Sequence, residues 1–173
     1  DDPALVERLL DRYVEWIEVV AGRASGLGFD VFISTDDFAF NTATFFSPQV
    51  FRELVLPRYR RVAASIRLPW VIHSDGNIGP LIDDLLSVGI VATHPNEPQA
   101  TDIRDMKRRY GDRLCVLGNV DLTLLSLGTP EEVDREVRDL IRDLGPGGGY
   151  ILTSGNSLTG YCRPENVLAM SAA

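Results

Sequence analysis

The chain has 173 residues, a length typical of one domain, and 45% of them are hydrophobic. Its 17 basic and 25 acidic residues leave a formal net charge of −8, which argues against a nucleic acid or an anionic membrane as a partner, because both attract positive charge. No apolar run approaches the ~20 residues of a membrane helix, and two cysteines are too few for a disulfide framework, so we expect a protein of the reducing cytoplasm.

The first third of the chain predicts a helix, a strand and a second helix. Apolar residues recur at helical spacing from residue 3 to about residue 24, and Asp2 can cap that helix. The apolar and β-branched segment 29–35 is typical of a strand. Ser47 and Pro48 then open a second helix, which Pro57 should kink or end.

The same alternation continues to the end of the chain. We expect strands at residues 70–72, 90–93, 114–117 and 150–153, and helices at residues 79–88, 102–110, 130–144 and 164–173. Thr129 and Glu132 have the spacing of a capping box, with Pro130 at the first helical position. The inward face of the helix that follows should carry Val133, Val137, Leu140, Ile141 and Leu144.

Five strands that are each followed by a helix indicate βα units and a parallel sheet. The strands are solid apolar runs, as expected where both faces of a sheet are buried. The chain contains no linker or low-complexity segment. We therefore predict an α/β fold and a single domain over residues 1–173.

Polar groups follow the carboxyl end of every predicted strand. In a (β/α) barrel or an open α/β sheet these ends share one rim, where ligands bind. The structural alternative for each residue is a cap of the next helix or a turn. The groups are Asp36 and Asp37, His73 and Asp75, His94 and Glu97, Asn119 and Asp121, and Ser154 and Asn156.

His73 and Asp75 form the sharpest local element of this rim. Residues two apart lie on the same side of an extended segment, so the imidazole and the carboxylate can face one ligand, such as zinc or another divalent metal. The alternative is a histidine hydrogen-bonded to a carboxylate in a turn. His94 precedes a proline and is interpreted as structural. A third metal ligand could come from Asn156, Glu97 or the pair Asp36 and Asp37.

Short motifs occur in a fixed order along nearly the whole chain: SPQVFRELVLP from residue 47, HSDGN from 73, YGDR from 110, GNVD from 118, GTPEEV from 128, GGYIL from 148, and PEN from 164 with AM at 169. This series resembles the uroporphyrinogen decarboxylase superfamily, which includes the haem-pathway decarboxylase and the cobamide-dependent methyltransferases. The resemblance implies a (β/α)8 TIM barrel with its site at the strand ends, of which this chain holds about the last five βα units. Since such barrels take about 250 residues, we expect Asp1 to lie within a longer protein.

The two branches of the superfamily differ at the rim. Methyltransferases that use coenzyme M bind zinc through a His-x-Cys motif and a distant cysteine, and the zinc activates the acceptor thiol. His73 matches that histidine, but Asp75 replaces the first cysteine and Asn156 falls near the second. Because both cysteines are replaced, we expect either a metal site with harder ligands, built from His73 and Asp75, or no metal site at all. The arginine motif of the decarboxylases would precede residue 1, so its absence does not separate the branches. Their histidine after the last strand is replaced near Asn156, and the HSDG motif from residue 73 resembles the methyltransferases more closely, so we favour the methyltransferase side.

The resemblance leads to three hypotheses. The first is an enzyme that transfers a methyl group between a small molecule and a corrinoid carried by a partner protein. In it, catalysis involves Asp36, Asp37, His73, Asp75 and Asp121, substrate binding involves Glu97, Asn119 and Asn156, and His73 and Asp75 hold a metal or polarise the substrate. The second is tetrapyrrole decarboxylation on the same rim without a cofactor. The third is an inactive barrel fragment whose open edges self-associate or pair with another chain.

Overall fold

The computed structural model describes residues 2–173 and contains a five-stranded parallel sheet. The strands are β1 (Phe32–Thr35), β2 (Trp70–His73), β3 (Ile90–His94), β4 (Cys115–Val120) and β5 (Tyr150–Ser154). Each strand pairs with the next one along the chain, in the order β1-β2-β3-β4-β5. The sheet does not close on itself, so β1 and β5 are edge strands. The α/β class with parallel strands is confirmed.

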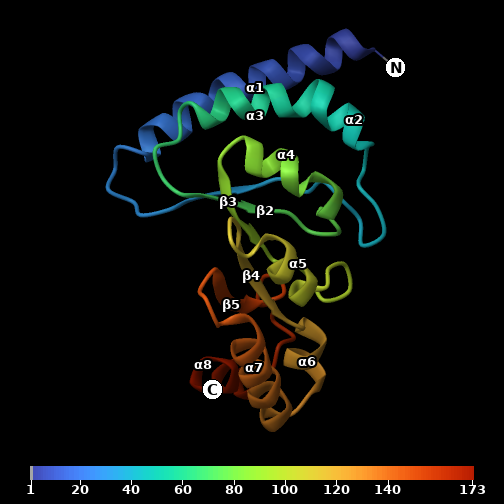
Figure 1. The fold of residues 1–173 in the computed structure, drawn as a ribbon, viewed down its shortest axis with the longest axis vertical. Coiled ribbons are helices and arrows are strands. Elements are labelled where there is room, and N and C mark those ends of the chain that lie inside the picture. The colour runs from blue at the N-terminus through green and yellow to red at the C-terminus, as the bar shows by residue number, and fades with distance from the viewer. Residues whose placement is uncertain (1) are drawn as a thin grey trace.

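Helices connect the strands and line one side of the sheet. Figure 1 shows α1 and α3 side by side at one end of the molecule, and α6, α7 and α8 together at the other. Among the residues described, no helix is long and apolar enough to cross a membrane. The elements are α1 (Pro3–Ala24), α2 (Pro48–Val50), η1 (Phe51–Val55), α3 (Leu56–Ala63), η2 (Gly79–Leu81), α4 (Ile82–Ser87), α5 (Ile103–Tyr110), α6 (Leu122–Leu127), α7 (Pro130–Leu144) and α8 (Pro164–Ala172).

The two faces of the sheet bury different clusters, because side chains alternate along a strand. Ile72, Val116 and Val120 belong to the main core, which the helices cover. The opposite face holds a small cluster of Val71, Ala92 and Leu117. The main core therefore lies between the sheet and the helices, and it holds the strand ends in place.

Several element boundaries differ from those expected. The first strand begins at Phe32 and not at residue 29, because pairing with β2 begins at Phe32 and Trp70. The fourth strand covers Cys115–Val120 and not residues 114–117, because its pairing with β5 continues to Val120 and Ser154. The short helix α6 was not predicted, and Ile141, expected to face inward, is 45% exposed.

Pro57 changes the geometry of the second helical segment, as the sequence predicts. Proline removes a backbone donor from the helix and crowds the preceding turn. The turn before it, η1, is a π-helix, and the α-helical pattern returns in α3 with Pro57 in its first turn. The proline is accommodated by this wider turn, so the helix continues past it.

Apolar side chains are exposed along β1 and α1. Ile33 is 59% exposed, Leu9 62% and Trp16 57%. Within residues 2–173 no strand pairs with the outer edge of β1, so the expectation of two buried faces fails at this strand. An exposed apolar area next to an unpaired strand edge is typical of a surface that associates with another polypeptide.

Replacing Thr129 with alanine should lower the free energy of unfolding by about 1 kcal/mol. The Thr129 hydroxyl accepts a hydrogen bond from the Glu132 backbone N–H at 3.3 Å, and the Glu132 carboxylate accepts one from the Thr129 N–H at 2.8 Å. Urea unfolding measures the change, with Thr123→Ala as the control, because Thr123 is exposed in α6. Equal losses in both variants would show that the cap does not stabilise α7.

Candidate functional site

Polar side chains from the ends of β1, β2, β3 and β5 meet at one edge of the sheet. We call Asp37, His73, Asp75, His94, Glu97 and Asn156 the rim cluster. The Asp75 N–H donates to Asp37 Oδ1 at 2.9 Å, and the Gly76 N–H donates to Glu97 Oε2 at 2.9 Å. Asn156 Nδ2 donates to Asp75 Oδ1 at 2.9 Å and to Glu97 Oε1 at 3.3 Å. These bonds connect residues that are up to 81 positions apart in the chain.

His73 and His94 lie side by side because their backbones are aligned in the pairing of β2 with β3. Their Nδ1 atoms are 2.6 Å apart, so one of the two carries the proton and donates it to the other. Burial, together with the neighbouring His73, lowers the pKa of His94, while Asp75 acts in the opposite direction. His94, interpreted as structural from the sequence, is therefore part of the rim cluster. Its position after β3 on the same rim was the available signal.

Asp37, His73 and Asp75 lie close enough together to hold a metal ion. Each offers one ligand atom, and the three atoms lie within 4.8 Å of one another. His73 Nδ1 contacts His94, which leaves Nε2, at 3.4 Å from Asp75 Oδ1, as the ligand atom. One imidazole and two carboxylates suit zinc and other divalent metals, and three protein ligands leave coordination positions for a substrate. Of the candidates for a third ligand, the geometry favours Asp37.

Asp36 points away from the rim cluster, although it adjoins Asp37. The Tyr59 hydroxyl donates a hydrogen bond to Asp36 Oδ2. Burial raises the pKa of Asp36, and the hydrogen bond from Tyr59 only partly offsets this. Asp36 therefore contacts the main core through Tyr59, whereas Asp37 faces the rim.

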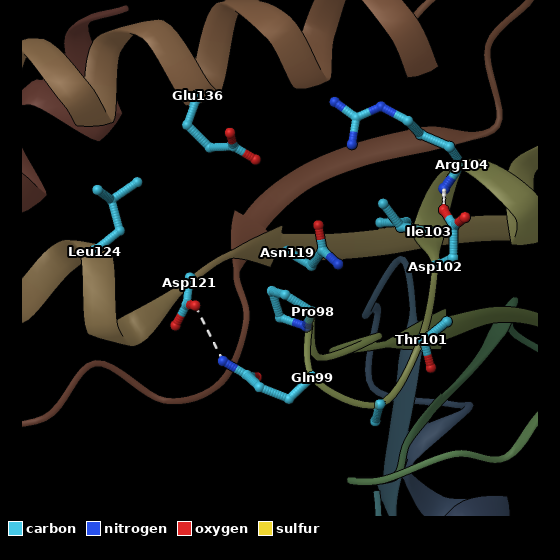
Figure 2. Close-up of a pocket in the computed structure, with 11 residues that line it drawn as sticks. Pro98, Gln99, Thr101, Asp102, Ile103, Arg104, Asn119, Asp121, Leu124 and Glu136 are labelled. Atoms are coloured by element: carbon cyan, nitrogen blue, oxygen red, sulfur yellow. Dashed lines mark hydrogen bonds between the residues drawn. The ribbon is translucent and has the colours of Figure 1, made fainter. Parts of the chain in front are cut away.

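Asn119 and Asp121, at the end of β4, also lie apart from the rim cluster. Asn119 Nδ2 donates to the Asn96 carbonyl at 2.6 Å. Asp121 Oδ1 accepts from the Thr123 N–H at 2.7 Å and caps α6, while its Oδ2 accepts from Gln99 at 3.0 Å. Asp121 therefore acts as the cap of the next helix, which is the structural role that the sequence also allows for a residue at a strand end. Both residues line a separate cavity of about 620 Å³ (Figure 2).

Replacing Asp36 with asparagine should stabilise the protein increasingly as the pH rises. The folded state binds the Asp36 proton more tightly than the unfolded state, because burial raises the carboxyl pKa. This contribution to stability is fully present below the ordinary pKa of about 3.9 and is lost as the pH rises through the higher folded value. Urea unfolding between pH 4 and pH 7 should show a difference between Asp36→Asn and the parent that grows with pH.

The control for this experiment is Asp30→Asn, because Asp30 is exposed on the segment just before β1. Asp30→Asn makes the same change of a carboxyl group to an amide at an exposed position, so an equal dependence on pH in both variants would show that the effect does not come from burial. If the difference for Asp36→Asn is constant, the burial of Asp36 does not affect its proton affinity in the folded state.

Comparison with known proteins places the chain among relatives that are about twice as long. The model of the family described as Uroporphyrinogen decarboxylase (URO-D) matches residues 1–173. The uroporphyrinogen decarboxylase of Pseudoalteromonas translucida is 26% identical over 171 residues, covering 94% of this chain and 44% of that protein. That of Methylococcus capsulatus is 27% identical over 179 residues, covering 100% and 49%. The chain thus spans about half the length of the curated relatives it matches.

A solved structure supports the fold assignment. A methyltransferase from Methanosarcina mazei has a TM-score of 0.79 and 25% sequence identity, and the match covers 98% of this chain and 48% of that one. The five-stranded sheet and its helices therefore have the arrangement of a part of that larger protein.

Proposed function

Because the chain belongs to the uroporphyrinogen decarboxylase family, we propose that it is a methyltransferase-type member that transfers a methyl group between a small molecule and a corrinoid on a partner protein. The observation that carries this proposal is the convergence of Asp37, His73 and Asp75 within 4.8 Å. The similarity to a methyltransferase structure supports it. The carboxyl ends of parallel strands, where these residues lie, are the usual location of such sites.

Some residues of the rim cluster would bind the metal, and the others would position the side chains that bind it. Asp37, His73 and Asp75 would hold a divalent metal, which supplies Lewis acidity and lowers the pKa of a bound substrate group. His94 orients the His73 ring through the contact between their Nδ1 atoms. Asn156 bridges Asp75 and Glu97, and so keeps both carboxylates directed toward the same space.

Methyl transfer can be tested with free methylcobalamin and a small thiol in the presence of zinc. The cobalt–carbon bond breaks, the methyl group joins the sulfur, the bonding electron pair stays on cobalt as cob(I)alamin, and the thiol proton passes to solvent. We expect the protein to convert the methylcobalamin spectrum to that of cob(I)alamin under anaerobic conditions, and His73→Ala to abolish this. An unchanged spectrum with zinc-loaded parent protein would contradict the proposal.

Tetrapyrrole decarboxylation is the second candidate, and the names of the curated relatives favour it. It would use the carboxylates of the rim cluster without a cofactor. Incubation with uroporphyrinogen and analysis of the products by chromatography separates the two candidates. Formation of decarboxylated porphyrinogens, with no methyl transfer, would replace the first proposal by the second.

We further propose that the exposed β1 edge pairs with a second copy of this chain. The expected result is a mass above 19.1 kDa in light scattering. Ile33→Lys should shift the protein toward the monomer, because it places a charge on the exposed strand. The control is Ile141→Lys, since Ile141 is comparably exposed on α7. A well-folded monomeric parent chain would overturn this proposal.

A further inference from the structure

We propose that the cavity beside β4 binds a small molecule through a primary ammonium group. This cavity, called here the Asn119 cavity, has a volume of about 620 Å³ and is lined by the segment from Pro98 to Arg104 together with residues of β4, α6 and α7. It is separate from the rim cluster. Glu97 binds Asn156 on the rim side, whereas Pro98 and Gln99 line the cavity.

Asn119 provides an acceptor oxygen to this cavity from a side chain that is otherwise largely buried. Asn119 is only 5% exposed. Its Nδ2 donates a hydrogen bond to the Asn96 carbonyl, and this contact fixes the assignment of the side-chain oxygen and nitrogen. Its Oδ1 accepts no hydrogen bond from any residue in the described range 2–173. Figure 2 shows this oxygen directed into the cavity, on the side of Arg104 and Glu136. An amide oxygen that faces a cavity and has no protein donor is a position where a ligand N–H gains a hydrogen bond.

The charges around the cavity favour a cation. Within residues 2–173, the Glu136 carboxylate has no hydrogen-bond or ion-pair partner, and Asp102 and Asp121 add negative charge. Arg104 is the one basic residue of the lining. An ammonium group carries three donors, which match the Asn119 oxygen and the Glu136 carboxylate.

Arg104 can extend recognition to the rest of the ligand. Its Nε donates to Asp143 Oδ2 at 2.9 Å, which leaves its terminal nitrogens as donors on the cavity side. A carboxylate on the ligand would bind these nitrogens. The ligand is then either a simple amine or an amino acid, and the primary ammonium group is common to both.

The test is a titration of the ¹⁵N-labelled protein with ethylamine, glycine or acetate at constant pH and ionic strength, followed by NMR. We expect saturable shifts with the two amines, centred on the backbone amides of residues 99–104 and 119–121. Glu136→Gln should weaken ethylamine binding about tenfold, because it removes a charged acceptor. Glu131→Gln is the matched control, since Glu131 lies on the exposed side of the same helix and outside the lining.

Arg104→Gln distinguishes the two ligand types. Weaker binding of glycine with unchanged binding of ethylamine identifies an amino acid, and unchanged binding of both identifies a simple amine. The proposal is overturned if neither amine saturates, if acetate produces the same shifts, or if Glu136→Gln and Glu131→Gln weaken binding equally. None of these outcomes depends on the rim cluster or on methyl transfer.

Discussion

His73→Ala should lower the affinity of the protein for Zn²⁺ by at least about 100-fold. His73 offers the only nitrogen among the three candidate ligands, and the two carboxylates that remain are a poor set for zinc. Competition with a chromophoric chelator measures the affinity, and metal analysis after dialysis measures the stoichiometry. The parent should retain about one equivalent, because residues 2–173 contain one such group of three ligands.

Asp75→Asn is a second test of this metal site, and Asp83→Asn is its control. Both substitutions change a carboxylate to an amide, but Asp83 lies on α4 in an exposed pair with Arg113. We expect Asp75→Asn to weaken zinc binding strongly and Asp83→Asn to leave it unchanged. If the parent protein retains no zinc after dialysis against micromolar metal, the site does not exist in the form proposed here.

Gly76→Ala should destabilise the protein by about 3 kcal/mol, the combined cost of backbone strain and a steric clash. Gly76 has φ +77°, a conformation that residues with a side chain rarely adopt. An added Cβ would lie 2.7 Å from the carbonyl oxygen of Phe40 and closer still to that of Ala39. Urea unfolding measures the loss, and zinc binding should fall as well, because Gly76 follows Asp75 and donates to Glu97.

Gly28→Ala is the matched control for this glycine. Gly28 has a nearly identical φ of +80°, but an added Cβ would meet no atom within 4 Å. It should therefore lose only the roughly 1 kcal/mol that is due to the backbone conformation. The difference between the two variants measures the clash at Gly76. Equal losses would mean that the segment at Ala39 moves aside at little cost.

The succession of strands and helices was predictable because it depends on local patterns. Asp2 caps α1 through its contact with the Leu5 N–H, and the capping box at Thr129 begins α7, as expected from residues three apart. The helix α6 was missed because its six residues, LTLLSL, are too few to show a helical period. So short a segment cannot be separated from a strand or loop by periodicity.

The sequence predicted where the candidate site lies, at the carboxyl ends of the strands, but not which side chains meet there. The order of polar residues after the strands indicated the rim, but adjacent residues such as Asp36 and Asp37 diverge, one toward Tyr59 and the other toward Asp75. Likewise, Asn119 and Asp121 line the Asn119 cavity and not the rim cluster. These directions depend on packing between elements that are distant in the chain.

The residue pattern alone was sufficient to establish a parallel α/β sheet with its polar groups at the carboxyl edge, since hydrophobic periodicity and strand polarity are properties of neighbouring residues. The choice of partners required the folded chain. Strand register places His94 against His73, and Asn156 reaches Asp75 across the sheet. Register and helix packing depend on the burial of the whole core. Contacts between side chains far apart in sequence therefore cannot be predicted from any short segment of the chain.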